Sequence, residues 1–522
     1  MDEKMVNLTI EGRTATVPEG TSILEAAKTV GILIPHYCYH PSLSIAGNCR
    51  MCQVQVEKQR KLMPACATAV ADGQVVHVYA EDALRARQGV LEHLLINHPL
   101  DCPICDKSGE CELQDYTYQE GRAEGRLREP KRFNPTEDFG GDVLYVTNRC
   151  ILCTRCVRFM AEKAQDPVLN ISERGDRAVI GKVPGHDLTD PWAGNVIYLC
   201  PVGALLSKDA LNKVRSWEMD RTPSICPGCS QGCNIVLETR DNTVVRLQPR
   251  PNHDVNEFFM CDEGRLGYRW MNRQDRVEYP MVRRGDGLAT AEWEAATAEA
   301  ASLLSGRRAF VLASPNLSNE ALFMLSRIAK KTGGAGAFRV RQGPEAPLPG
   351  AHDLALRVDR AANGDGAALM GLARDDAPLA RMQDGDVLIV ADEDLAGVDA
   401  ADAARAGAII VIGTTLPAWA RHAAAVVLPI TNFAEEEGTF TNLRGRVQRF
   451  RQAKSGPGFT RSSWLAAADL LTALGEPAEY LRAQDVFDAL ATANPEFAGM
   501  SYATLGLRGA LVASAASAGA VA

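Results

Sequence analysis

The cysteines of this chain are unevenly placed. All 15 lie between Cys38 and Cys261 of the 522 residues, and many follow one another at gaps of two or three. At such gaps neighbouring thiolates can face one metal, so buried chance thiols are the weaker interpretation. The N-terminus has no basic segment followed by an apolar one, so we expect a cytoplasmic chain without a signal peptide or a disulfide framework. The cysteines are therefore predicted to bind metal.

The first cysteine set comprises Cys38, Cys49, Cys52 and Cys66. It lies within a strand–strand–helix–loop–strand pattern, in which two alternating runs meet at a glycine turn and Ser22 and Glu25 begin a short helix. This is the order of a β-grasp ferredoxin, whose loop encloses a 2Fe-2S cluster. The first gap is ten residues, whereas the plant type has four. Four thiolates also suit tetrahedral zinc, so both metals stay open at this point.

The second set has only three cysteines, Cys102, Cys105 and Cys111. Three thiolates leave a 4Fe-4S cluster one ligand short. A helix predicted over residues 82–98 precedes them and ends near His98, because Pro99 disfavours helical backbone at the residue before it. Asp101, Asp106 or a water could fill the vacancy, but imidazole suits a sulfur-bridged iron better than a carboxylate oxygen does.

The third set begins with the C-x2-C-x2-C triplet of RCILCTRCVRF, a spacing that points three thiolates at one face of a cubic cluster. Met160 stands where a bacterial ferredoxin would have its fourth cysteine, and a later cysteine followed by Pro201 is the predicted replacement. The third set is thus Cys150, Cys153, Cys156 and Cys200. It is predicted to hold a 4Fe-4S cluster.

The fourth set comprises Cys226, Cys229, Cys233 and Cys261. A hairpin is predicted between its third and fourth members, around Asp241 and Asn242. A structural zinc ribbon is the alternative, but the uneven spacing and the nearby glycines favour a 4Fe-4S cluster.

The count of ligands bears on His98. Three sets contain four cysteines each, and the second set contains the remaining three, so every one of the 15 cysteines is assigned. A lone histidine is more often structural, but here only the second set lacks a ligand. We therefore predict that His98 completes it.

The order of these motifs resembles the large iron–sulfur subunit of respiratory complex I, the bacterial NADH-quinone oxidoreductase. The segments that carry the resemblance are HPLDCPICDKSGECELQD, RCILCTRCVRF, CPVGAL and CPGCSQGC, and it covers residues 5–275 closely. It implies one 2Fe-2S cluster on the first set and three 4Fe-4S clusters on the others, with His98 as a ligand. It also implies that the fourth cluster lies off the main electron path.

Beyond residue 276 the likeness is to the molybdopterin oxidoreductase fold, in a shortened form. The apolar runs RRAFVLAS, GDVLIVADED, AGAIIVIGT and AAAVVLPI alternate with Ala-rich segments, which predicts an α/β domain with a mainly parallel sheet. No cysteine follows Cys261, and the glycine-rich stretches lack the spacing of a phosphate-binding loop. We therefore expect no molybdopterin and no nucleotide site.

The predicted fold class is α+β with several domains. Their expected bounds are 1–82 for the β-grasp 2Fe-2S ferredoxin domain, 83–122 for the 4Fe-4S domain with one histidine and three cysteine ligands, 140–216 for a 4Fe-4S ferredoxin-like domain, 219–275 for the four-cysteine 4Fe-4S domain, 276–460 for the truncated α/β molybdopterin-oxidoreductase-like scaffold, and 461–522 for a C-terminal helical segment with a low-complexity tail.

The expected function is electron transfer within an NADH-quinone oxidoreductase, with no catalytic residue and no complete active site on this chain. The resemblance implies flavin-containing NADH-oxidising subunits and quinone-side iron–sulfur subunits as partners, with the membrane arm reached indirectly. The net charge of −9 with scattered basic residues argues against nucleic acid. We expect a peripheral position on the cytoplasmic face of the inner membrane without a transmembrane segment. The alternatives are a subunit of an NAD-linked molybdenum formate dehydrogenase or of an NAD-reducing hydrogenase.

Overall fold

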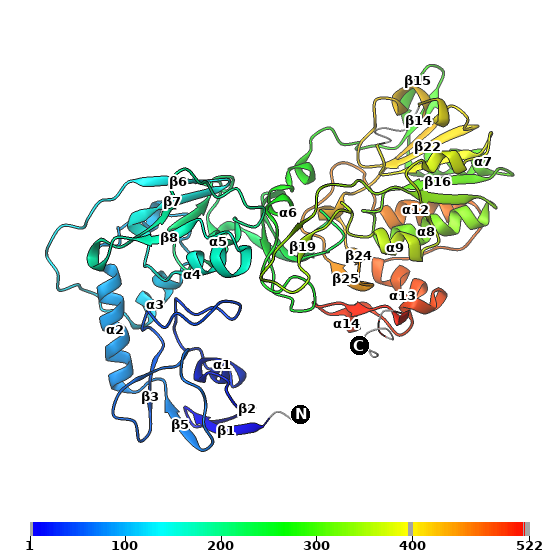
Figure 1. Cartoon of the computed structure of the whole chain (residues 1–522). Helices are drawn as coiled ribbons and strands as arrows, with labels where there is room; N and C mark the ends of the chain where they lie inside the picture. Colours follow the sequence, from blue (N-terminus) through cyan, green and yellow to red (C-terminus); the bar gives the residue numbers. More distant parts are fainter. Residues whose placement is uncertain (1–3, 395–399, 515, 517–522) are drawn as a thin grey trace. The chain divides into compact units, whose positions relative to one another are not determined.

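The computed structural model describes residues 4–394, 400–514 and 516. The end of the predicted low-complexity tail, from residue 517, lies outside the described residues. The chain divides into two compact units. Unit 1 comprises Met1–Glu218 and Leu348–His352, and unit 2 comprises Met219–Pro347 and Asp353–Ala522. In Figure 1 most of unit 1 runs from blue to blue-green and unit 2 from green to red.

Unit 1 begins with the predicted β-grasp arrangement. Its five-stranded sheet has the order β2-β1-β5-β3-β4, in which β1 pairs antiparallel with β2 and parallel with β5. Alternate residues of β1 are buried, because successive side chains of a strand point to opposite faces. The Oγ of Ser22 accepts a hydrogen bond from the backbone N–H of Glu25 and begins α1, as predicted. The elements are β1 (Met5–Ile10), β2 (Arg13–Pro18), α1 (Ile23–Thr29), β3 (Gln53–Val56), β4 (Met63–Pro64) and β5 (Gln74–His77).

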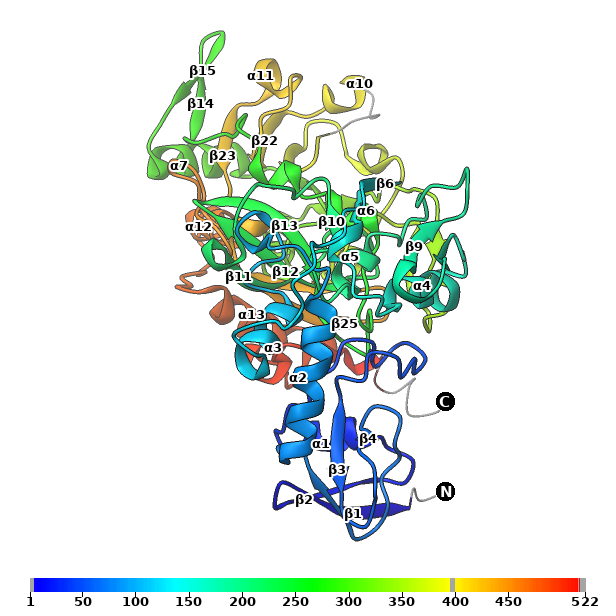
Figure 2. The same ribbon diagram turned by 90° about the vertical axis from the view of Figure 1, so that its left-hand side faces the viewer.

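A long helix, α2 (Glu81–Leu95), leads to the second set and packs against β3 and against α3 (Glu112–Glu120), as Figures 1 and 2 show. Leu91 is its most deeply buried leucine. The helix ends at Leu95, slightly before the predicted position. His98 therefore lies in the loop that enters the second set.

The rest of unit 1 consists of short elements joined by loops. One sheet has the order β10-β7-β6 and another pairs β8 with β9. The helix α4 passes directly into a π-helical segment, η3, a rare form that is frequent at functional sites. These elements are β6 (Thr136–Gly140), β7 (Val143–Val146), α4 (Arg155–Arg158), η3 (Phe159–Ala164), β8 (Leu169–Ser172), β9 (Val179–Lys182), α5 (Asn195–Leu199) and β10 (Leu205–Ser207).

Unit 2 opens with an antiparallel sheet of β11 (Asp220–Ile225), β12 (Asn234–Arg240) and β13 (Thr243–Pro249), followed by α6 (Asp262–Leu266). The turn between β12 and β13 has φ values of 48° at Asp241 and 59° at Asn242. A two-residue type I′ hairpin needs positive φ at both central positions, and Asp and Asn tolerate it. The predicted hairpin is confirmed.

The main body of unit 2 is an eight-stranded sheet of order β15-β14-β23-β22-β21-β16-β17-β20. Strands β20, β17, β16, β21, β22 and β23 are parallel, which confirms the mainly parallel sheet. Its strands are β14 (Met281–Arg284), β15 (Gly287–Thr290), β16 (Ala309–Ala313), β17 (Ala335–Phe338), β20 (Ala373–Arg374), β21 (Val387–Ala391), β22 (Ala408–Gly413) and β23 (Val426–Pro429).

Both faces of this sheet are covered by apolar side chains. Val311 and Ile389 belong to the core on one face, and Leu312 and Val390 to the core on the other. The helices that contribute to the first core are α7 (Trp293–Leu304), α8 (Asn319–Lys331), α12 (Ser463–Ala473) and α13 (Ala483–Ala493). Burial on both faces explains why these strands are continuous apolar runs rather than alternating ones.

The C-terminal segment joins the same body. Helix α12 packs against α7 and α8, and β26 (Ala510–Leu511) pairs with β25 (Arg446–Phe450), which in turn pairs with β24 (Gly438–Thr441). Across residues 4–394, 400–514 and 516, no helix has the length and apolar character needed to cross a membrane.

Candidate iron–sulfur sites

The four cysteines of the first set meet in the loop region beside β3. The four thiols lie close enough together to shift one another's pKa values. This proximity holds the pKa of Cys38 far below its usual range and raises that of Cys49. Four thiols this close together suit a shared metal centre.

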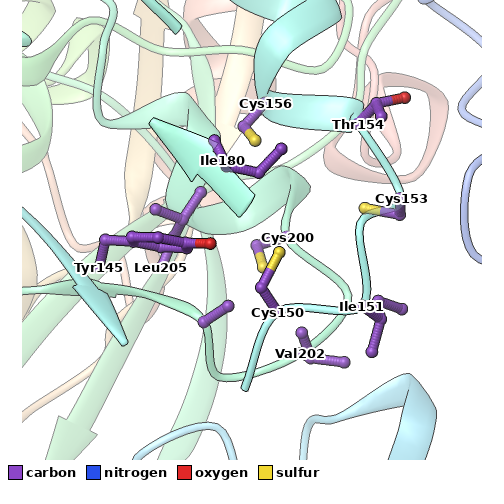
Figure 3. Close-up of a pocket in the computed structure, with 11 residues that line it drawn as sticks. Tyr145, Cys150, Ile151, Cys153, Thr154, Cys156, Ile180, Cys200, Val202 and Leu205 are labelled. Carbon is purple, nitrogen blue, oxygen red and sulfur yellow. The ribbon is translucent and has the colours of Figure 1, made fainter. Parts of the chain in front are cut away.

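The third set surrounds one small cavity, shown in Figure 3. The four sulfurs point towards the same space, and Cys200 reaches it from the end of α5. The other residues that line this cavity are mostly apolar: Tyr145, Ile151, Thr154, Ile180, Val202, Ala204 and Leu205. Burial raises the pKa of Cys150 to about 11 and that of Cys153 to about 12. Thiolates at this place need a compensating positive charge, which iron would provide.

The backbone of the third set's triplet is unusual. Leu152 and Thr154 both have positive φ, 54° and 63°. Residues other than glycine adopt this conformation rarely, and bulky ones are outliers that cluster at functional sites. The backbone N–H of Leu152 also points at the Cys150 sulfur, 3.4 Å away. The loop is thus bent so that its thiols converge.

The second set also surrounds a small cavity, and His98 lies in its lining with Cys102, Cys105 and Cys111. Among the described residues, Nδ1 of His98 is a buried polar atom with no hydrogen-bond partner. Burial, with Lys131 and Arg149 nearby, lowers the pKa of His98 to about 4. The imidazole is therefore neutral at neutral pH, as a metal ligand must be.

The two carboxylates that compete with His98 for the fourth position are engaged elsewhere. Oδ2 of Asp101 accepts hydrogen bonds from Arg149 at 3.0 and 2.8 Å, and Oδ2 of Asp106 accepts one from the backbone N–H of Asn212 at 2.9 Å. Of the three residues, His98 is the one with a buried polar atom that has no hydrogen-bond partner.

Gly203 and Arg215 contact the second set and hold its loop in place. A Cβ at Gly203 would lie 2.2 Å from the Cys105 sulfur, so only glycine fits at that point. Arg215 donates to the carbonyls of Cys102, Pro103 and Cys105 at 2.9 to 3.0 Å. The cysteine loop is held by its backbone, which leaves the sulfurs directed at the cavity.

In the fourth set, Cys226 follows β11 directly, and its backbone N–H bonds to the carbonyl of Cys233 at 2.8 Å. Cys261 caps α6, where its sulfur accepts from the N–H of Gly264 at 3.4 Å. A Cβ at Gly264 would lie 3.0 Å from the Cys226 sulfur and 3.5 Å from that of Cys261. Burial raises the pKa values of all four thiols.

A larger cavity of about 720 Å³ lies in unit 2 and is lined in part by Cys226. The fold family implies a molybdopterin, an anionic cofactor that needs free cationic or donor groups. Three of the lining arginines are instead paired with the chain's own carboxylates: Arg276 with Glu435 at 2.7 Å, Arg339 with Glu393 at 2.7 Å and Arg360 with Glu263 at 2.6 Å. These three arginines are neutralised within the chain and offer no free charge to an anionic pterin.

In the described part of the chain, no group of three or more His, Cys, Asp or Glu side chains forms a ready-made site for a single metal ion. The structure also places near the cysteines several residues that the sequence analysis did not single out, above all Arg149, Arg155 and Arg215. Arg149 and Arg155 both lie within the RCILCTRC motif, and this position was the sequence signal that could have identified them.

Sequence models of known protein families match five parts of the chain. They are the 2Fe-2S iron-sulfur cluster binding domain (residues 3–80), the NADH-ubiquinone oxidoreductase-G iron-sulfur binding region (87–126), the ferredoxin-like domain of NADH-quinone oxidoreductase subunit 3 (140–206), the molybdopterin oxidoreductase Fe4S4 domain (219–273) and molybdopterin oxidoreductase (361–473). The chain thus has iron–sulfur, ferredoxin-like domains followed by a domain that matches molybdopterin oxidoreductase.

Curated relatives make the likeness specific. The chain is 39% identical over 332 residues to the G subunit of NADH-quinone oxidoreductase from Rickettsia bellii, covering 63% of this chain and 49% of the relative. It is 40% identical over 334 residues to the corresponding protein of Streptomyces coelicolor (63% and 40%). It is 43% identical over 302 residues to the mitochondrial NADH-ubiquinone oxidoreductase 78 kDa subunit of Candida albicans (58% and 42%). The predicted resemblance is confirmed, and the match spans less than half the length of each of these relatives.

Among solved structures, the NAD+-reducing NiFe hydrogenase in the H2-reduced state aligns with 30% identity. It covers 40% of this chain and 90% of the hydrogenase chain, with a TM-score of 0.36.

Proposed function

We propose that this chain is an electron-transfer iron–sulfur subunit of a respiratory NADH-quinone oxidoreductase. It would relay electrons from a flavin-containing, NADH-oxidising partner to quinone-side iron–sulfur subunits. The names of the relatives and the matched iron–sulfur regions support this role. We place it on the cytoplasmic face of the membrane, attached through the complex, and keep the six domain bounds given above.

The proposed ligands are the four sets. A 2Fe-2S cluster is held by Cys38, Cys49, Cys52 and Cys66, and 4Fe-4S clusters by His98, Cys102, Cys105 and Cys111, by Cys150, Cys153, Cys156 and Cys200, and by Cys226, Cys229, Cys233 and Cys261. The observation that carries the proposal is that His98, whose buried Nδ1 has no hydrogen-bond partner, lines a small cavity together with three cysteines. Burying an imidazole nitrogen without a partner costs free energy, and a bound iron removes that cost.

When bound, such clusters take up and release single electrons. The residues of this chain hold them and control their surroundings. Apolar side chains such as Ile180, Val202 and Leu205 exclude water from the third set, and this lowers the local dielectric constant. The hydroxyl of Tyr145 is directed at the sulfurs of Cys150 and Cys200 (Figure 3) and lowers the pKa of Cys150 against the larger effect of burial.

The proposal includes no molybdopterin. The paired arginines of the unit 2 cavity and the absence of cysteine after Cys261 support a scaffold role for the α/β body. A molybdenum formate dehydrogenase would instead need molybdenum in this chain. Elemental analysis of the native complex separates the two, because stoichiometric molybdenum assigned to this chain contradicts the electron-relay role.

The test is substitution of His98 in the assembled complex. We expect the unaltered chain to carry about 14 iron atoms. His98→Ala should lose about four of them and one electron paramagnetic resonance (EPR) signal, and NADH-to-quinone electron flow should slow. His93→Ala is the matched control, because His93 is exposed on α2 only five residues earlier. An unchanged iron content and unchanged spectra in His98→Ala would contradict the ligand assignment.

A further inference from the structure

Arg155 lies between two cysteines of the third set and is almost completely buried, with 5% of its surface exposed. Its guanidinium contacts three separate parts of unit 1. One terminal nitrogen, Nη2, donates to the carbonyl of Tyr39 at 2.8 Å. The other, Nη1, donates to the carbonyl of Leu199 at 3.2 Å and to Oε1 of Glu112 at 3.4 Å.

Each of these acceptors adjoins a proposed cluster ligand in the sequence. Tyr39 follows Cys38 of the first set, Leu199 precedes Cys200 of the third set, and Glu112 follows Cys111 of the second set. The side chain of Arg155 therefore donates hydrogen bonds to residues that adjoin three different cysteine sets. Its acceptors lie between 43 and 116 residues away in the sequence, so the contacts arise only from the folded arrangement.

The next turn of the same helix strengthens the connection to the first set. Arg158 donates to the carbonyls of Cys38 and Ser44, and also to that of Cys153 at 3.4 Å. Glu162, in the π-helical segment, accepts from the backbone N–H of Ser44 at 2.9 Å. The loop of the first set is thus fastened to the segment that immediately follows the third set's triplet.

Arg155 can also act through its charge. The guanidinium remains protonated at all ordinary pH values, so Arg155 places a permanent positive charge in a buried region. Reduction adds one electron to a cluster and makes it more negative. A fixed positive charge nearby stabilises the reduced form, and it does so more strongly where water is excluded.

We propose that Arg155 is a positioning residue that fixes the first and third cysteine sets relative to one another and raises the reduction potentials of both clusters. This proposal rests on the proposed ligand sets. The contact of Arg155 next to the second set is the longest of the three, at 3.4 Å to Oε1 of Glu112. The effect of Arg155 on the second cluster is therefore the smallest of the three.

The experiment uses the purified complex with full iron content and follows each cluster by EPR during a redox titration. Arg155→Gln removes the charge and keeps one donor group, whereas Arg155→Lys keeps the charge but loses the planar fork. Arg85→Gln is the control, because it removes the same charge from an exposed ion pair with Glu81 in the same unit. Iron content measures whether each variant still assembles its clusters.

In Arg155→Gln we expect lower potentials for the first and third clusters and a smaller shift for the second. Arg155→Lys and Arg85→Gln should keep the potentials of the unaltered protein. Equal shifts in the Lys and Gln variants would show that only the geometry of the fork matters, and would overturn the electrostatic role. Unshifted potentials in Arg155→Gln would overturn it as well.

If Arg155→Gln loses iron, the reduction potentials of Arg155→Lys test the proposal instead. Potentials equal to those of the unaltered protein support the proposal, and lowered potentials overturn it. Absence of the expected cluster signals from the unaltered protein would contradict the ligand sets themselves, so the two failures are distinguishable.

Discussion

The cysteine-rich unit 1 and the α/β body of unit 2 are stabilised in different ways. Unit 1 has short strands, loops that converge on small cavities, and 11 of the 15 cysteines. The α/β body has no cysteine and buries a wide parallel sheet between two apolar cores. Hydrophobic burial can stabilise the body by itself, whereas the cavities of unit 1 place buried thiols and an unpartnered imidazole close together.

One chain thus divides its stability between two sources. In unit 1 the bound metal should be part of the folded state, because the free energy of binding contributes directly to the free energy of folding. In the α/β body, side-chain packing should be sufficient. The two regions should therefore respond to different perturbations.

The largest expected effect is that of removing iron. Chelation of the reduced protein should leave the loops at residues 98–111 and 150–156 with amide exchange within about tenfold of an unfolded chain. Strands β16, β21 and β22 should remain protected, because their core contains no metal ligand. Hydrogen exchange detected by mass spectrometry measures the amide protection of both regions in one experiment. Equal loss of protection in both would contradict the division.

A single added methyl group should break one site in unit 1. In Gly203→Ala the new Cβ would lie 2.2 Å from the Cys105 sulfur, so we expect loss of about four iron atoms and of the second cluster's EPR signal. Gly228→Ala is the control, because its Cβ would lie an ordinary 3.5 Å from the Cys226 sulfur. A full iron content in Gly203→Ala would show that the second site adapts more readily than the structure indicates.

The converse substitution tests the α/β body. Ile389 is fully buried in the central strand β21, so Ile389→Ala should lower the free energy of unfolding of this body by about 2–5 kcal/mol. The EPR spectra of the unit 1 clusters should stay the same. Ile389→Val should cost only about 0.5–1.5 kcal/mol. Denaturant unfolding followed by circular dichroism, with EPR on the same samples, provides the measurement.

A smaller effect should appear as a pH dependence of the α/β body. Burial raises the pKa values of Glu320 and Glu436 from 4.5 to about 7. A carboxyl group with a higher pKa in the folded state binds more protons when folded, so stability is greatest below the unfolded pKa. The free energy of unfolding should therefore fall as pH rises from about 4.5 to about 7.

Glu436→Gln should flatten this slope, because the substituted side chain cannot ionise. Glu294→Gln, at an exposed glutamate, should leave the slope unchanged. Urea unfolding at a series of pH values tests both variants. A slope of the opposite sign in the unaltered protein would contradict the raised pKa values.

Much of the fold was predictable because its signals are local. Thiol spacing indicated the cysteine sets, alternation indicated β1 and β2, and continuous apolar runs indicated the parallel strands β16, β21 and β22. The hairpin at Asp241 and Asn242 was also predictable, since those residues tolerate the left-handed backbone of a tight turn.

The remaining features depend on long-range packing. Helix α2 ends at Leu95 rather than near His98, and a pattern of hydrophobic residues cannot locate a helix end to within a few positions. The contacts of Arg155 join residues far apart in sequence, so no local pattern reveals them. For the same reason, the sequence did not show that α12 packs into the core of the α/β body.

The position of Cys200 has a consequence for biosynthesis. It reaches the third set from the end of α5, 44 residues after Cys156. At about 5–20 residues per second, a ribosome needs roughly 2–9 s to make that stretch. During this interval the nascent chain displays three thiols without the fourth. All four ligands are available only once the chain has been synthesised as far as Cys200, so a complete cluster on this set cannot be held before that point.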